Sequence, residues 1–208
     1  FLETQGVDRV ITFDLHAGQI QGFFNRTRLD NIYTEPYFIH YINKEILNNI
    51  SKNQLVIVSP DEGGVKTATR VAKKLNCSAS ILYKERSQPG VVDKMVLMGD
   101  VKDKYCFIID DMIDTAGTAC KACDILLENG ATKVFIGACH GILSNPAVER
   151  ISKSNFEKVI VSNTVEIENR FTDKSLLSKI EILDVSKICA AAIERSLIGQ
   201  SLSELMVL

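Results

Sequence analysis

The residues best suited to chemistry follow a buried-looking apolar run and precede a helical pattern. The run 107–109 leads into two adjacent carboxylates, Asp110 and Asp111, and the segment 114–118 then supplies an acid, two threonines, an alanine and a glycine. Backbone N–H groups at a helix start can hold a phosphate, and glycine lets the backbone approach it closely. Paired acids can accept hydrogen bonds from hydroxyl groups or hold a hydrated cation. We therefore predict a phosphate site beside two acids.

A purely structural alternative is a capped helix start with Asp114 as the cap. One cap does not explain two further acids at the end of a buried strand. The functional interpretation is therefore favoured.

A second segment, 59–66, also lies between an apolar strand pattern and a helix pattern. Gly63 and Gly64 could let backbone amides wrap a diphosphate, with Asp61 beside them. The spacing differs from that of a Walker A loop. The same residues also form an ordinary turn, so both interpretations stay open.

Two cations leave another predicted strand. Lys84 and Arg86 lie on the same side of an extended chain and precede a turn or mobile loop at 87–90. They could stabilise an anionic transition state. They could equally be solvated cations at the end of a strand, and these residues alone favour neither interpretation.

Histidine and cysteine give weaker signals. His16 follows a strand and could bind a metal or donate to a phosphate, although a lone histidine is more often structural. His40 lies in a helix pattern and His140 has no assigned role. Cys120 and Cys123 have the spacing of a redox or metal pair. Cys123 belongs to an apolar helical stripe, however, and a single pair lacks the partner ligands of a zinc site, so core packing is favoured.

The elements around these residues alternate between strand and helix patterns, which predicts an α/β fold with a mainly parallel sheet flanked by helices. We expect strands at 10–13, 55–58, 80–83, 106–109, 133–138, 159–161 and 180–183. We expect helices at 35–50, 66–75, 118–128, 146–152 and 185–197. Ligands of such sheets gather at the carboxyl ends of the strands, where the polar segments lie.

Composition excludes several classes of protein. The 208 residues include 24 basic and 26 acidic side chains, and a net charge of −2 argues against a nucleic-acid binder. No apolar run approaches the roughly 20 residues of a membrane span. We expect the six cysteines to be reduced and the protein to be cytoplasmic.

With these motifs placed, the sequence resembles the ribose-phosphate diphosphokinase family, whose fold is phosphoribosyltransferase-like. The stretches that carry the resemblance are 14–24, 59–61 with 63–64, 84–86, 92–95, 99–101 and 110–118. They occur in the family's order and cover nearly the whole chain. Phosphoribosyltransferases share the 110–118 motif but not the 14–24 stretch.

The resemblance implies transfer of diphosphate from Mg-ATP to the anomeric hydroxyl of ribose 5-phosphate, with AMP released. It implies catalytic roles for Lys84 and Arg86, diphosphate binding by Asp61, Gly63 and Gly64, and Mg²⁺ held or positioned by His16 and Asp61. It assigns ribose 5-phosphate to Asp110, Asp111, Asp114, Thr115, Ala116, Gly117 and Thr118.

The resemblance also implies a homo-oligomer of dimers within a hexamer. Five residues match the family's regulatory region: Gln21, Asp30, Asn31, Ser201 and Ser203. Family members begin about a hundred residues earlier, so residues 1–34 would end a truncated N-terminal domain and 35–208 would form the C-terminal domain. Without the missing ATP surface, we expect this fragment alone to be inactive.

Three departures are Glu62 in place of a small residue, the segment 25–28 in place of a stretch with proline, and Ser87 in place of a basic residue. One alternative function is a non-catalytic regulatory homologue, although the motifs around His16, Lys84 and 110–118 are intact. The other is a phosphoribosyltransferase, against which the 14–24 stretch argues.

Overall fold

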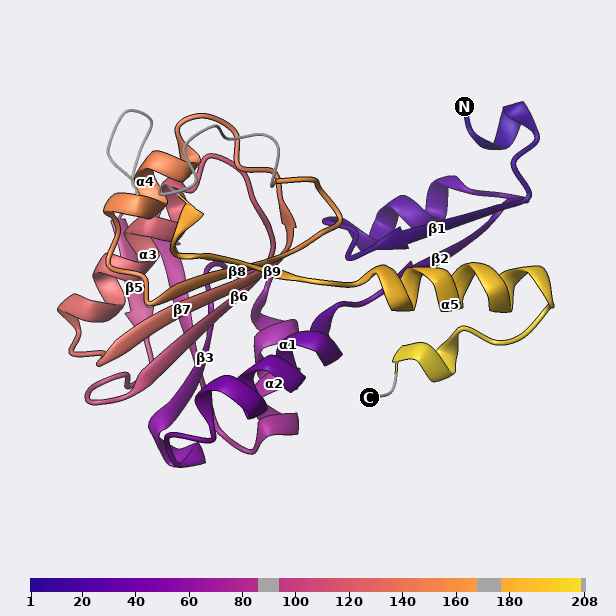
Figure 1. The fold of residues 1–208 in the computed structure, drawn as a ribbon. Helices are drawn as coiled ribbons and strands as arrows, with labels where there is room; N and C mark the ends of the chain where they lie inside the picture. Colours follow the sequence, from indigo (N-terminus) through magenta and orange to yellow (C-terminus); the bar gives the residue numbers. More distant parts are fainter. Residues whose placement is uncertain (86–93, 168–176, 207–208) are drawn as a thin grey trace.

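A computed structural model describes residues 1–85, 94–167 and 177–206 of the chain. Its main feature is a seven-stranded sheet in the order β5-β4-β3-β6-β7-β8-β9 (Figure 1). The strands are β3 (Leu55–Ser59), β4 (Ser78–Glu85), β5 (Lys94–Met98), β6 (Tyr105–Ile113), β7 (Lys133–Gly141), β8 (Lys158–Ser162) and β9 (Ile180–Leu183). Only the β4–β5 pair is antiparallel among these described strands. The predicted α/β class and mainly parallel sheet are thus confirmed.

Helices cover both faces of this sheet. The α-helices are α1 (Glu35–Tyr41), α2 (Val65–Leu75), α3 (Gly117–Glu128), α4 (Ala147–Lys153) and α5 (Ser186–Leu197). Shorter helical turns are Glu3–Gln5, Gly18–Phe23, Ile42–Ile46, Lys52–Gln54 and Ser203–Met206. Within the described ranges, no helix has the length and apolar character needed to cross a bilayer.

Strand alternation divides the core between the two faces. Cys106 and Ile108 of β6 join the apolar cluster under α3 and α4, whereas Phe107 and Ile109 join the cluster under α1 and α2. Both clusters are possible because side chains alternate across a strand and this sheet is covered on both faces. Consecutive apolar residues in β6 therefore follow from burial on two sides.

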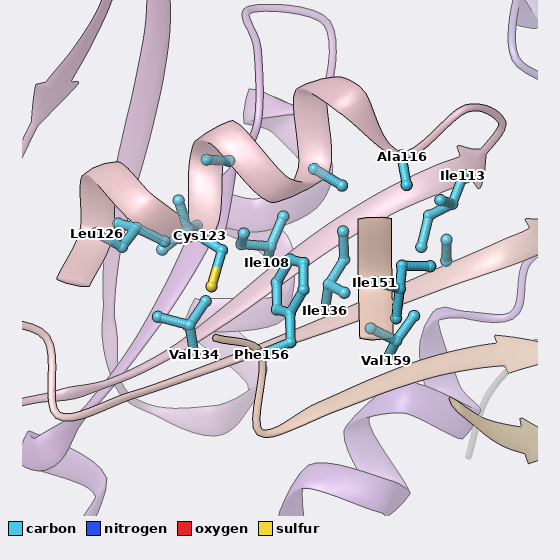
Figure 2. Close-up of a cluster of buried hydrophobic side chains, with 14 of the residues drawn as sticks. Ile108, Ile113, Ala116, Cys123, Leu126, Val134, Ile136, Ile151, Phe156 and Val159 are labelled. Atoms are coloured by element: carbon cyan, nitrogen blue, oxygen red, sulfur yellow. The ribbon is translucent and has the colours of Figure 1, made fainter. Parts of the chain in front are cut away.

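Figure 2 shows the cluster beneath α3, where Cys123 and Leu126 lie over Ile108 and Val134. Cys123 is fully buried, and Cys120 packs against the same cluster. All six cysteines are free. The core-packing interpretation of the two cysteines is confirmed.

A second, smaller unit is built from both ends of the chain. β1 (Arg9–Phe13) pairs in parallel with β2 (Arg28–Ile32). Its apolar cluster joins Ile32 to Ile188 and Ala192 of α5 and to Leu202. Figure 1 shows β1, β2 and α5 together, to one side of the large sheet. We call β1, β2, α5 and the turns 3–5, 18–23 and 203–206 the terminal unit; the domain boundary at residue 34 stays a prediction.

Several elements differ from expectation. β2 and β5 were not predicted; polar residues interrupt the apolar pattern of β2. The expected helix 35–50 is α-helical only to Tyr41 and continues as a single π-helical turn to Ile46. β6 extends four residues beyond the predicted end, to Ile113, which places Asp110 and Asp111 inside the strand. The predicted loop 87–90 lies outside the described residues.

Candidate active site

Most of the predicted site residues meet in one cavity of about 550 Å³. It lies at the carboxyl ends of β3 and β6, which are neighbouring parallel strands. Its lining includes eleven of the predicted residues: His16, Asp61, Gly63, Gly64, Asp110, Asp111, Asp114, Thr115, Ala116, Gly117 and Thr118. Two loops and a histidine that are far apart in the sequence therefore share one chamber.

The loop between β6 and α3 presents a helix start without a side-chain cap. Ala116 occupies the N-cap position in the left-handed conformation, at φ +58°, and no side chain bonds to the cap amides. The structural alternative that Asp114 caps the helix is therefore wrong. Because the first N–H groups of a helix have no partner within it, the start of α3 can receive an anion.

Arg150 supports this loop from α4, and the sequence analysis did not single it out. Its Nη1 donates to the Thr115 carbonyl oxygen at 2.9 Å. A Cβ atom on Gly117 would lie 3.2 Å from the same nitrogen, so glycine permits the close approach. No local motif marks Arg150, because its partner lies 35 residues away.

The β3–α2 loop is both a turn and a wall of the cavity. Ser59 Oγ donates to the Asp61 carbonyl at 2.6 Å, and Gly64 N donates to Asp61 Oδ1 at 3.1 Å. A Cβ on Gly64 would come within 2.7 Å of Ser59 Oγ, which any larger residue would displace. The loop thus keeps a tight backbone beside the acids.

The acids form a cluster of like charge. Burial, and then the neighbouring Asp111 carboxyl, raise the pKa of Asp110 to about 7, and the charge of Asp61 acts in the same direction. Such a cluster favours a bound proton or a cation.

His16 approaches this cluster from the terminal unit. Its Nδ1 lies 2.7 Å from Asp111 Oδ2, across 95 residues of sequence. The hydrogen bond to Asp111 is the main cause that raises the pKa of His16, followed by that carboxylate's charge. The sequence predicted a role for each residue but not that the two would touch.

The donor set fits Mg²⁺ in a particular way. Asp61 and Asp111 offer the carboxylate oxygens that this ion prefers. Within the described residues, no group of three His, Cys, Asp or Glu side chains is arranged to hold a metal ion. A site with few protein ligands suits Mg²⁺, which keeps several waters and commonly binds substrate phosphates.

Three residues that line another side of the cavity were not singled out by the sequence analysis. Buried Glu35 pairs with Arg70 of α2, and the Arg70 guanidinium lies 6.0 Å from the centre of the Tyr33 ring. All three residues line the cavity. Glu35 looked like an ordinary first-turn helix acid, and only packing of α1 against α2 reveals this pairing.

The remaining predicted residues lie elsewhere or outside the description. The backbone of Lys84 pairs with Met95, but the Lys84 side chain and the whole of Arg86 are outside the described residues. The residues matched to the regulatory region do not line the cavity: Gln21, Asp30, Asn31, Ser201 and Ser203. All five belong to the terminal unit or to the connection after α5, and their regulatory role stays a prediction.

Fold and site together define an α/β protein with a mainly parallel sheet and a polar cavity at the carboxyl ends of β3 and β6. A family profile described as the phosphoribosyl synthetase-associated domain matches residues 84–207. The solved phosphoribosylpyrophosphate synthetase of Mycobacterium smegmatis is 34% identical with a TM-score of 0.83, and the match covers 95% of this chain. The chain belongs to the ribose-phosphate diphosphokinase family, also called the phosphoribosylpyrophosphate synthetases.

The match covers 61% of the mycobacterial protein, so this chain spans about three fifths of that relative's length. More distant likenesses include a purine phosphoribosyltransferase from Pyrococcus horikoshii Ot3, at 19% identity and TM-score 0.43, covering 67% of this chain and 82% of that one. An adenine phosphoribosyltransferase from Trypanosoma brucei has 16% identity and TM-score 0.44, with 76% and 74% covered.

Proposed function

We propose that the intact protein transfers diphosphate from Mg-ATP to the anomeric hydroxyl of ribose 5-phosphate, which yields phosphoribosyl diphosphate and AMP. The observation that carries this proposal is the uncapped start of α3 beside Asp110 and Asp111 in a cavity. The helix start can bind a phosphate through its N–H groups, and the two carboxylates can accept hydrogen bonds from hydroxyls. Together in one cavity they match the two ends of a sugar phosphate. This chain would supply the ribose 5-phosphate site.

The two loops divide the substrate between them. Residues 114–118 would hold the 5-phosphate, and Asp110 and Asp111 would accept hydrogen bonds from the ribose hydroxyls. The segment 61–64 follows the adjacent strand β3, so it would receive the diphosphate as it reaches the sugar. Positioning of this kind supplies much of the catalysis in phosphoryl transfer.

Charge neutralisation is the other requirement. His16 and Asp61 would hold or position Mg²⁺, with the Asp111 carboxylate beside them, and the ion when bound offsets the negative charge of the phosphates. His16, beside Asp111, would orient that carboxylate. The family resemblance adds Lys84 and Arg86 as cations for the transition state, and a homo-oligomeric, cytoplasmic protein as the wider context.

Ribose 5-phosphate binding tests the site directly. In calorimetry on the intact protein, Thr118→Val and Asp111→Asn should each weaken binding about 10- to 100-fold. Thr118→Val removes a hydroxyl that would donate to the charged phosphate, and Asp111→Asn removes the charged acceptor for a ribose hydroxyl. Thr132→Val and Asp124→Asn make the same chemical changes at exposed positions outside the cavity and should leave affinity unchanged. Equal affinity in all four variants would refute the assignment.

Turnover tests the reaction itself. The intact protein, given Mg-ATP and ribose 5-phosphate, should release AMP and phosphoribosyl diphosphate in equal amounts. The 208-residue chain alone should form little product, since it spans about three fifths of the mycobacterial relative and the resemblance assigns much of the ATP surface to the part that it does not match. Sugar binding without turnover in the intact protein would favour the non-catalytic homologue instead.

A further inference from the structure

The position of His16 over the acid cluster needs a structural cause. Its side chain is 72% exposed, so packing around the ring does not hold it against Asp111. The ring's direction therefore depends on how the backbone leaves β1 two residues earlier. That backbone is unusual, because Asp14 has a positive φ of +33°. Residues held in such sparsely populated conformations are restrained by their surroundings.

One restraint comes from within the terminal unit and the start of α1. The Asp14 amide donates to the Ile32 carbonyl at 2.9 Å. The Asp14 carboxylate accepts from the Thr34 amide at 3.0 Å and from the Thr34 hydroxyl. Burial raises the pKa of Asp14, while these hydrogen bonds oppose the rise. Asp14 is thus tied to β2 and to the start of α1.

The Leu15 amide adds a hydrogen bond to Asn31 Oδ1 of β2 at 3.2 Å, and a further restraint comes from the large sheet. His140 in β7 places Nε2 2.9 Å from the Phe13 carbonyl oxygen, 127 residues away. A carbonyl can only accept, so Nε2 carries the proton. The other nitrogen, Nδ1, therefore accepts a hydrogen bond, and the Thr164 hydroxyl at 2.9 Å is its donor. The imidazole is therefore fixed at both ends, between the large sheet and the last residue of β1.

We propose that His140 is a positioning residue for His16. By holding the Phe13 carbonyl, it sets the direction in which the chain leaves β1, and so keeps the His16 ring on Asp111. This inference rests on the proposed function for its catalytic consequence, but the geometry can be tested separately. It assigns a role to a histidine that does not itself line the cavity but pairs in the sheet with Met112, which does.

The test uses the intact protein with His140→Leu, His140→Gln and, as a matched control, His40→Leu. His40 is exposed on α1 and does not line the cavity. His140→Leu should lower kcat about 10- to 100-fold, because small misplacements of catalytic groups have effects of this size. Ribose 5-phosphate affinity should fall by a smaller factor than kcat, since loop 114–118 is untouched and only the orientation of Asp111 changes. His140→Gln, whose amide can donate to Phe13, should recover part of kcat, and His40→Leu should retain it.

Hydrogen exchange supplies a readout that does not depend on activity. Amides of residues 14–16 should exchange faster in His140→Leu, while those of β6 should keep their protection. Unchanged exchange at 14–16, or unchanged kcat in an active enzyme, would overturn the proposal. An inactive wild-type protein would refute the proposed function, and the exchange result would still decide the positioning role.

Thr164→Val provides a second variant in case His140→Leu fails to fold. It keeps the ring and its contact with Phe13 but removes the hydroxyl beside Nδ1. It should loosen residues 14–16 in the same direction and by a smaller factor. Two results together would show that His140 has a general structural role only. In folded Thr164→Val, residues 14–16 would keep the wild-type protection. In His140→Leu, the amides of β6 would exchange as fast as those of residues 14–16.

Discussion

The large sheet and the terminal unit support the same cavity in different ways. The sheet has an apolar cluster on each face, and the segments 59–64 and 110–118 begin in the last residues of its packed strands β3 and β6. The terminal unit has a single small cluster and leaves Phe23 and Leu197 exposed. The residues that would bind phosphate and sugar therefore follow well-packed strands. His16, by contrast, follows the lightly packed strand β1, whose position depends on hydrogen bonds.

A matched pair of core substitutions tests this contrast in packing. Leu126 and Leu202 are both buried, in the cluster under α3 and in the terminal unit respectively. Leucine-to-alanine changes in cores cost about 2–5 kcal/mol, and more where the surroundings cannot collapse into the cavity. In urea unfolding of the intact protein, Leu126→Ala should lie at the upper end and Leu202→Ala at the lower. The reverse order would break the comparison.

Substitutions at Lys84 and Arg86 should change kcat without a matching change in KM. If Lys84 and Arg86 contact the phosphates mainly in the transition state, Lys84→Ala and Arg86→Ala lower kcat about 100- to 1,000-fold with little change in KM. Steady-state kinetics of the intact protein measure both constants. Lys102→Ala is a control at an exposed lysine after β5. A near-normal kcat would identify either residue as a solvated strand-end cation.

The acid cluster should cost the sheet stability as pH rises. The folded pKa of Asp110 is about 7 against an ordinary value of 3.8, so between these values the folded state holds more protons. Stability then falls as pH rises through this window, by at most about 1.4 kcal/mol per pH unit, and the loss is complete above pH 7.

Asp110→Asn removes this titration. The variant's stability advantage over wild type should therefore grow from pH 4 to pH 7 and level off above. Urea unfolding at each pH measures the difference, and Asp124→Asn at an exposed position of α3 should show no such trend. If the difference in unfolding free energy between Asp110→Asn and wild type is constant from pH 4 to pH 7, the pKa of Asp110 is not raised in the folded state.

Local patterns were enough to place most of the site. The strand at 106–109 and the helix at 118–128 were predicted because burial and helical periodicity appear in neighbouring residues. Loops between such elements of a parallel sheet meet at one edge, so the convergence of 59–64 and 110–118 was also expected. The end of β6 was misplaced, because the strand continues through polar residues that pair with β7.

What the sequence determined by itself is therefore the order of elements, the two loops and the types of ligand they carry. Only the tertiary structure decided that His16 touches Asp111, that Arg150 supports Thr115, and that His140 holds Phe13. These pairs are separated by 95, 35 and 127 residues. Periodicity and turn chemistry act over a few residues, whereas such contacts arise only when packing of the sheet and helices brings distant segments together.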